Sequence, residues 1–304
     1  METTFYIVRH GKTEFNEAGK VQGWCDSPLT AEGVQSARAM GRVLAPVDFA
    51  AAYSSDMGRT RQTLVELLCA RHDARENAAA SGSAQAASSG AAASKSAQTA
   101  PSGAPAETPA VASAPASPGP APSLLDPAAE LAAFEAAAAQ GDPFLIDGIP
   151  CRDDRRIREW CYGDLEGKTG MPIHARLKEG FGRELTFAEE NERLSETADI
   201  LAAHDASGRA ERFSQIEQRL RSFLSDVGEE TLAAGGGNVL MVTHSFAIRT
   251  LVYLFDCARV NDPLRLLNGS LTRISFDGKA FAVHEIGVLE LPDQDDLRAS
   301  SSAM

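Results

Sequence analysis

The feature that most constrains this chain is an apolar run at residues 5–8, which ends in Arg9-His10-Gly11. Two of the four apolar residues are aromatic and two are β-branched, which predicts a strand buried on both faces, as in a parallel sheet. In open α/β sheets, ligands bind at the carboxyl edge, where such a strand ends. Arg9 and His10 are therefore expected at the mouth of a site, and Gly11 permits a tight turn there.

A second apolar strand is predicted at residues 238–243, and it also ends in a histidine, His244. Ser245 is then expected to cap the helix that follows. One histidine at a strand end is usually structural, but two of them with arginines in step favour a single shared site. The donors that follow His10, among them Asn16, indicate an anion such as phosphate.

Periodic apolar residues and turn signals predict the remaining elements, with strands and helices alternating along the chain. These are a helix capped by Thr30, a short strand over residues 49–53, a helix that opens near Arg59, a helix over residues 128–139 and a hairpin over residues 271–286. Together they predict one domain over residues 1–304. Its expected fold is a three-layer α/β/α architecture with a mixed, mostly parallel sheet.

Three segments differ from this core. Residues 77–123 are dominated by small residues and proline, since 39 of the 47 are Ala, Ser, Pro or Gly. They contain no Leu, Ile, Phe, Met, Tyr or Trp, so a disordered insertion is predicted. Residues 171–206 are charged and helical in period, and we expect them to form a lid over the site. Residues 292–304 are predicted to be a flexible polar tail.

Charge and cysteine usage exclude several classes of partner. The 304 residues carry 29 Lys and Arg against 42 Asp and Glu, a net charge of -13, so neither nucleic acid nor an anionic membrane is an expected partner. No apolar run approaches a membrane span and no signal peptide is evident, so a cytoplasmic location is expected. Five scattered cysteines without zinc spacing predict reduced thiols and no metal site. The oligomeric state stays open.

Several blocks of the chain resemble the histidine phosphatase superfamily, which includes cofactor-dependent phosphoglycerate mutases. The matching residues are Arg9-His10-Gly11 with Asn16, Gln22 and Gly23; Ser54-Ser55-Asp56 with Arg59; Glu159-Trp160 with Tyr162; and Thr243-His244-Ser245 with Arg249. The ordered series covers most of the chain outside the insertion. Glu211 also matches a Gly-Glu-Ser signature of the family, whereas Arg212 departs from it and leaves the contact of the usual serine in doubt.

The resemblance implies a role for each matching residue. His10 would be the nucleophile that forms a phosphohistidine, and Glu159 would be the proton donor. Arg9, Arg59 and His244, helped by Asn16, would hold the phosphoryl group. The remaining candidates for substrate binding are Gln22, Gly23, Tyr162 and Ser245. No metal ion and no other cofactor is implied. Taken without the family blocks, Glu159 would rather be read as half of a surface ion pair.

The expected activity is hydrolysis of a small phosphorylated metabolite, with water as the phosphoryl acceptor. A cofactor-dependent phosphoglycerate mutase is the alternative, and a non-catalytic binder of phosphorylated ligands is a third possibility. Arg176, Arg183 and Arg193 stand singly in the lid segment, so they are not expected to form the paired clamp that a phosphoglycerate carboxylate requires. An inward turn of Lys178 or Arg183 would change that expectation.

Overall fold

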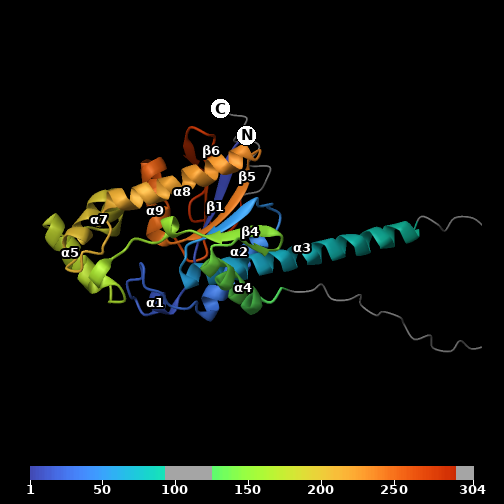
Figure 1. The fold of residues 1–304 in the computed structure, drawn as a ribbon, viewed down its shortest axis with the longest axis horizontal. Helices are drawn as coiled ribbons and strands as arrows, with labels where there is room; N and C mark the ends of the chain where they lie inside the picture. The colour runs from blue at the N-terminus through green and yellow to red at the C-terminus, as the bar shows by residue number, and fades with distance from the viewer. Residues whose placement is uncertain (93–124, 292–304) are drawn as a thin grey trace, which may run out of the picture.

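The computed structural model describes residues 1–92 and 125–291, and a seven-stranded sheet lies at its centre (Figure 1). The strands are β1 (Thr3–Arg9), β2 (Ala51–Ser54), β3 (Phe144–Ile146), β4 (Ile149–Asp153), β5 (Gly237–Thr243), β6 (Leu271–Phe276) and β7 (Phe281–Val283). Their order across the sheet is β3-β4-β2-β5-β1-β6-β7. Strands β4, β2, β5 and β1 pair in parallel, whereas β3, β6 and β7 add antiparallel pairs at the two edges. The predicted α/β class with a mixed sheet is confirmed.

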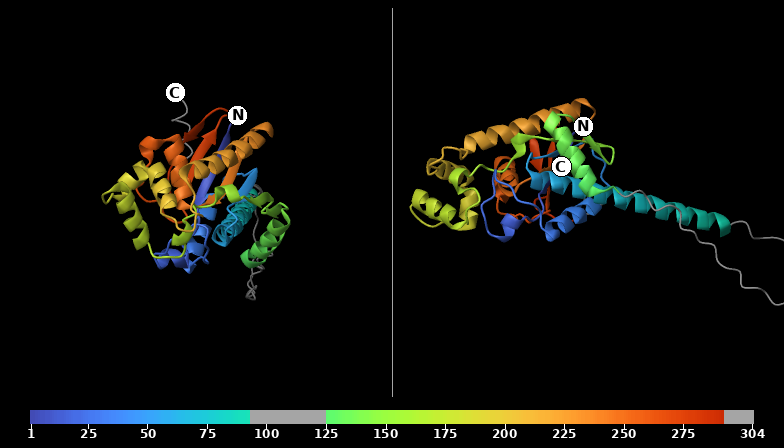
Figure 2. Two further views of the ribbon diagram at one scale, coloured as in Figure 1. Left: turned by 60° about the vertical axis from the view of Figure 1, so that its left-hand side comes forward. Right: turned by 60° about the horizontal axis from the view of Figure 1, so that its bottom comes forward.

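Helices cover both faces of this sheet (Figures 1 and 2). They are α1 (Glu14–Glu17), α2 (Ala31–Val43), α3 (Gly58–Ala92), α4 (Pro127–Gln140), α5 (Met171–Phe181), α6 (Phe187–Glu192), α7 (Leu194–Ala203), α8 (Phe213–Ala233) and α9 (Ser245–Phe255). Short 3₁₀ turns lie at Arg155–Ile157, Gly163–Leu165 and Cys257–Arg259. Helices α8 and α9 share one apolar core with the sheet, and α2, α3 and α4 share the other.

Strand β1 shows why both faces must be covered. Phe5 and Ile7 belong to the core beneath α8 and α9, whereas Tyr6 and Val8 belong to the core beneath α2 and α3. Successive side chains of a strand point to opposite faces, so an unbroken apolar run needs a helical layer on each side. The strand is therefore buried on both faces, as its sequence predicts.

The same packing places the two strand-end histidines together. Strands β1 and β5 pair in parallel, with Arg9 opposite Thr243, so their next residues leave the sheet at the same edge. The backbone N–H of His10 donates to the carbonyl of Thr243 at 2.9 Å, which continues the ladder by one step. His10 and His244 are thus neighbours because of strand register.

The end of helix α3 differs from the sequence-based prediction, whereas the ends of helix α4 agree with it. Helix α3 runs on to Ala92, so the predicted start of a disordered insertion at residue 77 is wrong; the alanine-rich sequence there has high helix propensity and no proline. The remainder of that insertion, residues 93–123, and the tail at 292–304 lie outside the described residues. The predicted helix after residue 126 is confirmed, with the side chain of Asp126 as N-cap and Gly141 as a left-handed C-cap.

The segment expected to be a lid is helical, as predicted. It folds into α5, α6 and α7, which gather at the end of the molecule opposite to the projecting end of α3 (Figure 1). Ile173, Phe187 and Asn191 from this segment reach the cavity at the sheet edge. Movement of the segment over that cavity remains a prediction.

Candidate active site

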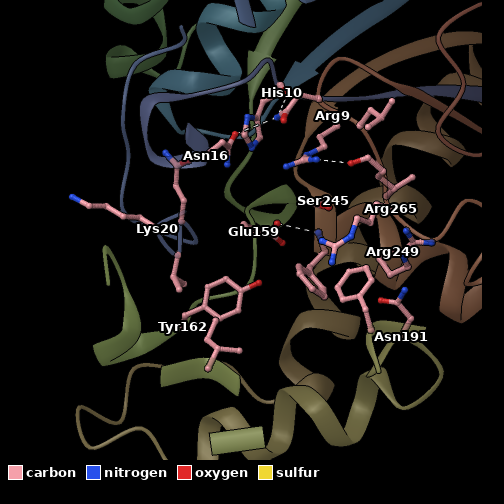
Figure 3. A pocket seen from close by; sticks show the side chains of 18 residues that line it. Arg9, His10, Asn16, Lys20, Glu159, Tyr162, Asn191, Ser245, Arg249 and Arg265 are labelled. Carbon is pink, nitrogen blue, oxygen red and sulfur yellow. Dashed lines mark hydrogen bonds between the residues drawn. The ribbon is translucent and has the colours of Figure 1, made fainter. Parts of the chain in front are cut away.

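A cavity of about 400 Å³ opens at the carboxyl edge of the sheet, next to the ends of β1 and β5 (Figure 3). Its lining includes most of the site residues expected from the sequence: Arg9, His10, Asn16, Gln22, Glu159, Tyr162 and Ser245. The other three, Arg59, His244 and Gly23, are not part of the lining. Arg59 contacts both His244 and Gly23, and His244 lies beside His10.

His10 is held in one tautomer by its own turn. The ring is buried, and its Nδ1 lies 2.8 Å from the carbonyl oxygen of Gly11. A carbonyl only accepts hydrogen bonds, so Nδ1 carries the proton and Nε2 carries the lone pair. Asn268 fixes the turn by donating to the carbonyl of His10 at 2.9 Å, and the N–H of Gly11 donates to Thr63 Oγ1 at 3.0 Å. Nε2 of His10 is therefore the free, nucleophilic nitrogen.

The electrostatics of this end of the cavity keep His10 neutral. Burial holds the pKa of His10 well below its usual range, and the charges of Arg59 and Arg9 lower it further. Desolvation also lowers the pKa of Arg9, to about 10, which leaves it charged at neutral pH. Arg9 donates through Nη1 to the carbonyl of Leu266, while its buried Nε has no partner within the described residues. A charged donor without a partner beside the cavity suits an anionic oxygen.

His244 is fixed by Arg59. Nε and Nη2 of Arg59 lie 3.3 and 3.0 Å from Nδ1 of His244. Because a guanidinium only donates, Nδ1 accepts, and Nε2–H of His244 donates to Ser55 Oγ at 3.0 Å. Burial, with the charge of Arg59 next in size, holds the pKa of His244 well below its usual range. The two histidine rings meet edge-on with centroids 5.2 Å apart.

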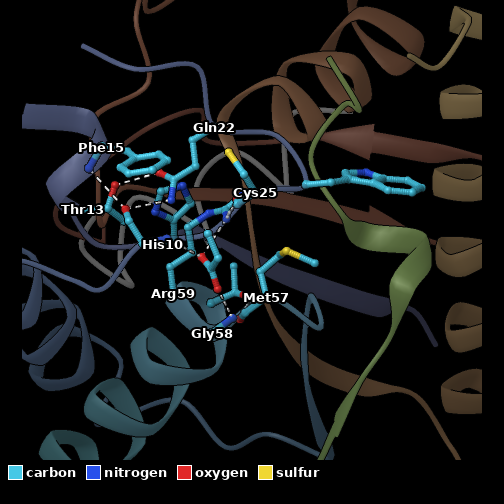
Figure 4. Close-up of polar contacts among 12 residues, drawn as sticks. His10, Thr13, Phe15, Gln22, Cys25, Met57, Gly58 and Arg59 are labelled. Carbon is cyan, nitrogen blue, oxygen red and sulfur yellow. Dashed lines mark hydrogen bonds and ion pairs between the residues drawn. The ribbon is translucent and has the colours of Figure 1, made fainter. Parts of the chain in front are cut away.

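The other donors of Arg59 are used by the loop that follows α1 (Figure 4). Nη2 donates to the carbonyl of Gly23 at 2.7 Å, and Nη1 donates to the carbonyl of Cys25 at 2.8 Å and to Asp26 Oδ1 at 2.9 Å. A Cβ at Gly23 would overlap the carbonyl oxygen of Trp160, so only glycine fits this turn. Arg59 therefore acts on the cavity through its charge, with its donors already bound by protein.

Glu159 is a buried carboxyl at the start of α9, and not half of a surface ion pair. Its Oε1 accepts from the backbone N–H groups of Trp160 and Ala247, and its Oε2 accepts from that of Phe246, all at 3.0 Å. These bonds favour the ionised form, but burial outweighs them, so the pKa of Glu159 lies above its usual range. A carboxyl with a raised pKa that faces the cavity can act as a general acid.

The contacts of Glu159 also explain how α9 begins. His244 is the N-cap residue, and it makes no side-chain cap hydrogen bond. The prediction that Ser245 caps this helix is wrong, because Ser245 is the first helical residue and lines the cavity. Glu159 instead supplies the acceptors for two exposed N–H groups of the first turn, where a carboxylate interacts favourably with the helix dipole.

A half-buried ion pair positions the backbone around Glu159. Arg219 pairs with Glu211 (Nε–Oε1 2.8 Å) and donates through Nη2 to the carbonyl of Glu159 at 2.9 Å. Glu211 also accepts from the N–H of Cys161 through Oε2 at 3.0 Å. Glu211, which matches the family signature, therefore positions the backbone of Glu159 and Cys161 through these contacts. Arg212 lies at the N-cap of α8, away from this pair.

The lining also contains residues that the sequence analysis did not assign to the site. They are Lys20, Val21, Ile173, Phe187, Asn191, Phe246, Arg249, Arg265, Leu266, Leu267 and Asn268. Arg249 carried a signal, since it lies four residues after Ser245 and so on the same face of α9. Arg265 and Asn268 carried none, because they lie in a loop whose position depends on tertiary packing.

The basic residues of the lid segment are neutralised locally. Arg176 pairs with Asp164 and Arg193 with Glu196, while Arg183 and Lys178 pair with Glu189 and Glu184. None of these four cations lines the cavity in the described structure. The expectation that the lid lacks a paired arginine clamp is consistent with these contacts, and neither Lys178 nor Arg183 turns inward.

Comparison with known proteins identifies the family. The model of the histidine phosphatase superfamily (branch 1) matches residues 5–78 and 133–288, the whole frame around the site. The chain belongs to the histidine phosphatase superfamily. Members of the family act on small phosphorylated substrates.

Individual relatives match a smaller part of the chain or are less similar to it in sequence. A probable phosphoglycerate mutase GpmB of Serratia proteamaculans is 47% identical over 58 residues, which are 19% of this chain and 27% of that protein. The phosphoglycerate mutase of Bacillus anthracis has the same fold, with a TM-score of 0.65 and 23% identity over 95% of this chain and 94% of that one. The α-ribazole phosphatase of Shigella flexneri gives a TM-score of 0.52 at 14% identity, covering 96% and 100%. The fold is shared by a mutase and a phosphatase.

Two further findings concern the described part of this phosphatase-family chain. Within residues 1–92 and 125–291, no three His, Cys, Asp or Glu side chains lie close enough to hold a metal ion. In the same ranges, no helix has the length and apolar character needed to cross a membrane.

Proposed function

We propose that the chain is a phosphomonoester hydrolase that works through a phosphohistidine on His10. One observation carries this proposal: the cavity is lined both by a neutral histidine with a free Nε2 and by a buried carboxyl, Glu159, with a raised pKa. A nucleophile and a proton donor facing one space are what transfer of a phosphoryl group from an alcohol requires.

The reaction would proceed in two steps. Nε2 of His10 attacks phosphorus, the P–N bond forms, and the P–O bond to the alcohol breaks while Glu159 delivers its proton to the leaving oxygen. Water then attacks the phosphohistidine, Glu159 takes up a proton from that water, and inorganic phosphate leaves with His10 restored. Arg9 would bind the phosphoryl oxygens directly, and Arg59 would add positive charge from behind the histidines.

Trapping of the intermediate tests this assignment. The wild-type chain is mixed with 4-nitrophenyl phosphate, quenched in base, and mapped by mass spectrometry, with His10→Ala as the variant and His244→Ala as the matched control. We expect a base-stable phosphate on His10, which His10→Ala loses together with turnover. Steady hydrolysis by His10→Ala, or a phosphate on His244, would refute it. Absence of turnover in the wild-type chain would favour a phospho-ligand binder.

A phosphoglycerate mutase is the second candidate, and cations outside the lid favour it. Lys20 and Arg265 line the cavity, and neither makes an ion pair within the described residues. Two such cations are suited to a second anionic group of a substrate, such as a carboxylate. Incubation with 3-phosphoglycerate and a trace of 2,3-bisphosphoglycerate separates the candidates. Release of inorganic phosphate faster than formation of 2-phosphoglycerate supports the hydrolase, and the reverse result supports the mutase.

A further inference from the structure

A second cavity of about 210 Å³ lies next to the first one, between the lid helices and the start of α9. The two cavities share five lining residues: Tyr162, Ile173, Phe187, Phe246 and Arg265. Those shared side chains form the boundary between the two spaces. The second cavity therefore lies one layer of side chains away from the space that Glu159 lines.

The walls of this second cavity are mainly apolar. Trp160, Leu177 and Leu201 are buried and line it, together with Ile173 and Phe246. Trp160 presents only its carbon surface, because its indole N–H is bound to Thr250 Oγ1 at 3.0 Å. An alcohol with many polar groups would lose hydrogen bonds to water on entering this space, whereas an apolar ring would gain free energy.

This cavity is also lined by the titratable side chains of Glu190, His174 and Arg265. Glu190 is only 9% exposed, yet it lines the second cavity. Nδ1 of His174 lies 4.0 Å from Oε1 of this carboxyl, and no hydrogen bond to the carboxyl is found in the described ranges. Burial raises the pKa of Glu190. A buried carboxyl without hydrogen bonds is suited to an O–H or N–H donor from a ligand, and it repels an anionic group placed next to it. Arg265 lies at the boundary with the first cavity, where it can still pair with an anion.

We propose that the second cavity binds the leaving alcohol of the substrate, and that this alcohol carries an apolar ring with an O–H or N–H donor at its far end. The inference rests on the proposed hydrolase function, since it assigns the leaving group of that reaction. Size supports it, because an apolar cavity of about 150 Å³ already accepts benzene. The chemistry selects a one-ring apolar alcohol over a phosphorylated acid.

Binding of stable phosphonates tests the cavity without any turnover. Phenethylphosphonate and ethylphosphonate share the anionic group and differ only in the ring. By calorimetry we expect the phenethyl compound to bind about 10-fold to 100-fold more tightly, as burial of one ring predicts. A 4-hydroxyl on the ring should preserve or strengthen binding, and a 4-carboxylate should weaken it. Equal affinities for the phenethyl and ethyl compounds would overturn the proposal.

Two variants locate the effect. Leu201→Phe should fill the cavity and reduce the preference for the phenethyl compound by about 10-fold, with ethylphosphonate binding unchanged as the internal control. Glu190→Gln is nearly isosteric, and it should relieve the penalty on the 4-carboxylate; thermal melts confirm that each variant is folded. If both variants keep the wild-type preferences, the ring binds elsewhere and the proposal is wrong.

Turnover of the matching esters separates the two proposals. Phenethyl phosphate and ethyl phosphate both release a primary alcohol, so their leaving groups differ little in chemistry. We expect kcat/KM to favour the phenethyl ester by the same factor as binding. If the phosphonates differ in affinity but neither ester is hydrolysed, the hydrolase function fails while the cavity remains a ring-binding site. If both esters are hydrolysed equally, the hydrolase function stands and the assignment of the leaving alcohol fails.

Discussion

Replacement of Glu159 by glutamine gives the sharpest test of the proton-donor role, because the structure predicts two separable effects. The first is chemical. An amide cannot deliver a proton, and general acid catalysis contributes about 10²–10⁴-fold only where the leaving group needs that proton. Glu159→Gln should therefore slow ethyl phosphate by about 10²–10⁴-fold, and it should slow 4-nitrophenyl phosphate far less, since nitrophenolate leaves without a proton.

The second effect is on stability. Glu159 accepts three backbone N–H groups, two at Oε1 and one at Oε2. Glutamine can keep the pair at its carbonyl oxygen, but its NH₂ then faces the N–H of Phe246. One buried donor left without an acceptor costs about 1–3 kcal/mol. At about 2–4 °C per kcal/mol for a chain of this size, the melting temperature should fall measurably.

Glu166→Gln is the matched control. The carboxyl of Glu166 accepts the N–H groups of Gly23, Trp24, Cys25 and Tyr162 at 2.9 to 3.0 Å, and it lines neither cavity. This variant should lose stability and slow both esters by the same factor. The assay is kcat/KM for each ester, with thermal denaturation of each variant. If Glu159→Gln slows the two esters equally, Glu159 is only a helix cap and the reasoning fails.

Three further outcomes are expected. Burial raises the pKa of Glu159 and lowers that of His10. We therefore expect kcat/KM for ethyl phosphate to persist below the ordinary pKa of histidine and to fall as pH rises through the raised carboxyl pKa, and Glu159→Gln should remove that alkaline fall; a pH profile checks both. Glu211→Gln should lower kcat more than it raises KM, because it loosens the hold of Arg219 on the Glu159 backbone; an effect on KM alone would count against this. Replacement of residues 93–123 by a short Gly/Ser loop should preserve the cooperative thermal transition and activity, since each doubling of loop length changes the closure cost by only about 0.6 kcal/mol; loss of the transition would contradict it.

The parts of the site that follow from strand ends could be predicted from the sequence. His10 and His244 each follow a strand that is apolar on both faces. Such strands are typical of parallel sheets, in which the carboxyl ends of the strands lie at the same edge. Glu159 could be selected only through the family resemblance, because Arg158 beside it made a surface ion pair plausible. In the structure Arg158 pairs with Asp56 instead, and the carboxyl of Glu159 turns inward to α9.

Other parts could not be read from the sequence because they depend on packing between distant segments. Arg265 and Asn268 reach the cavity from a loop that no periodic pattern marks. Helix α3 continues past residue 77 because the helix propensity of alanine does not depend on packing against an apolar face. The prediction of disorder relied on the absence of large apolar residues in this segment. The donors of Arg59 are satisfied by carbonyls of the Gly23–Asp26 turn, and the direction of those carbonyls is set by backbone conformation rather than by residue type.

The contacts of Glu159 give a physical reason why the proposed proton donor comes from a segment far from the histidines in sequence. The first turn of α9 presents unpaired N–H groups next to the cavity, and its own N-cap, His244, is committed to Arg59 and Ser55. An acceptor must therefore come from elsewhere, and the carboxyl that supplies it is thereby fixed by three backbone N–H groups. Burial raises its pKa, while those bonds limit the rise and would let the carboxylate re-form after each proton transfer in the proposed reaction. A donor that must give up a proton and then take one from water needs both opposing influences.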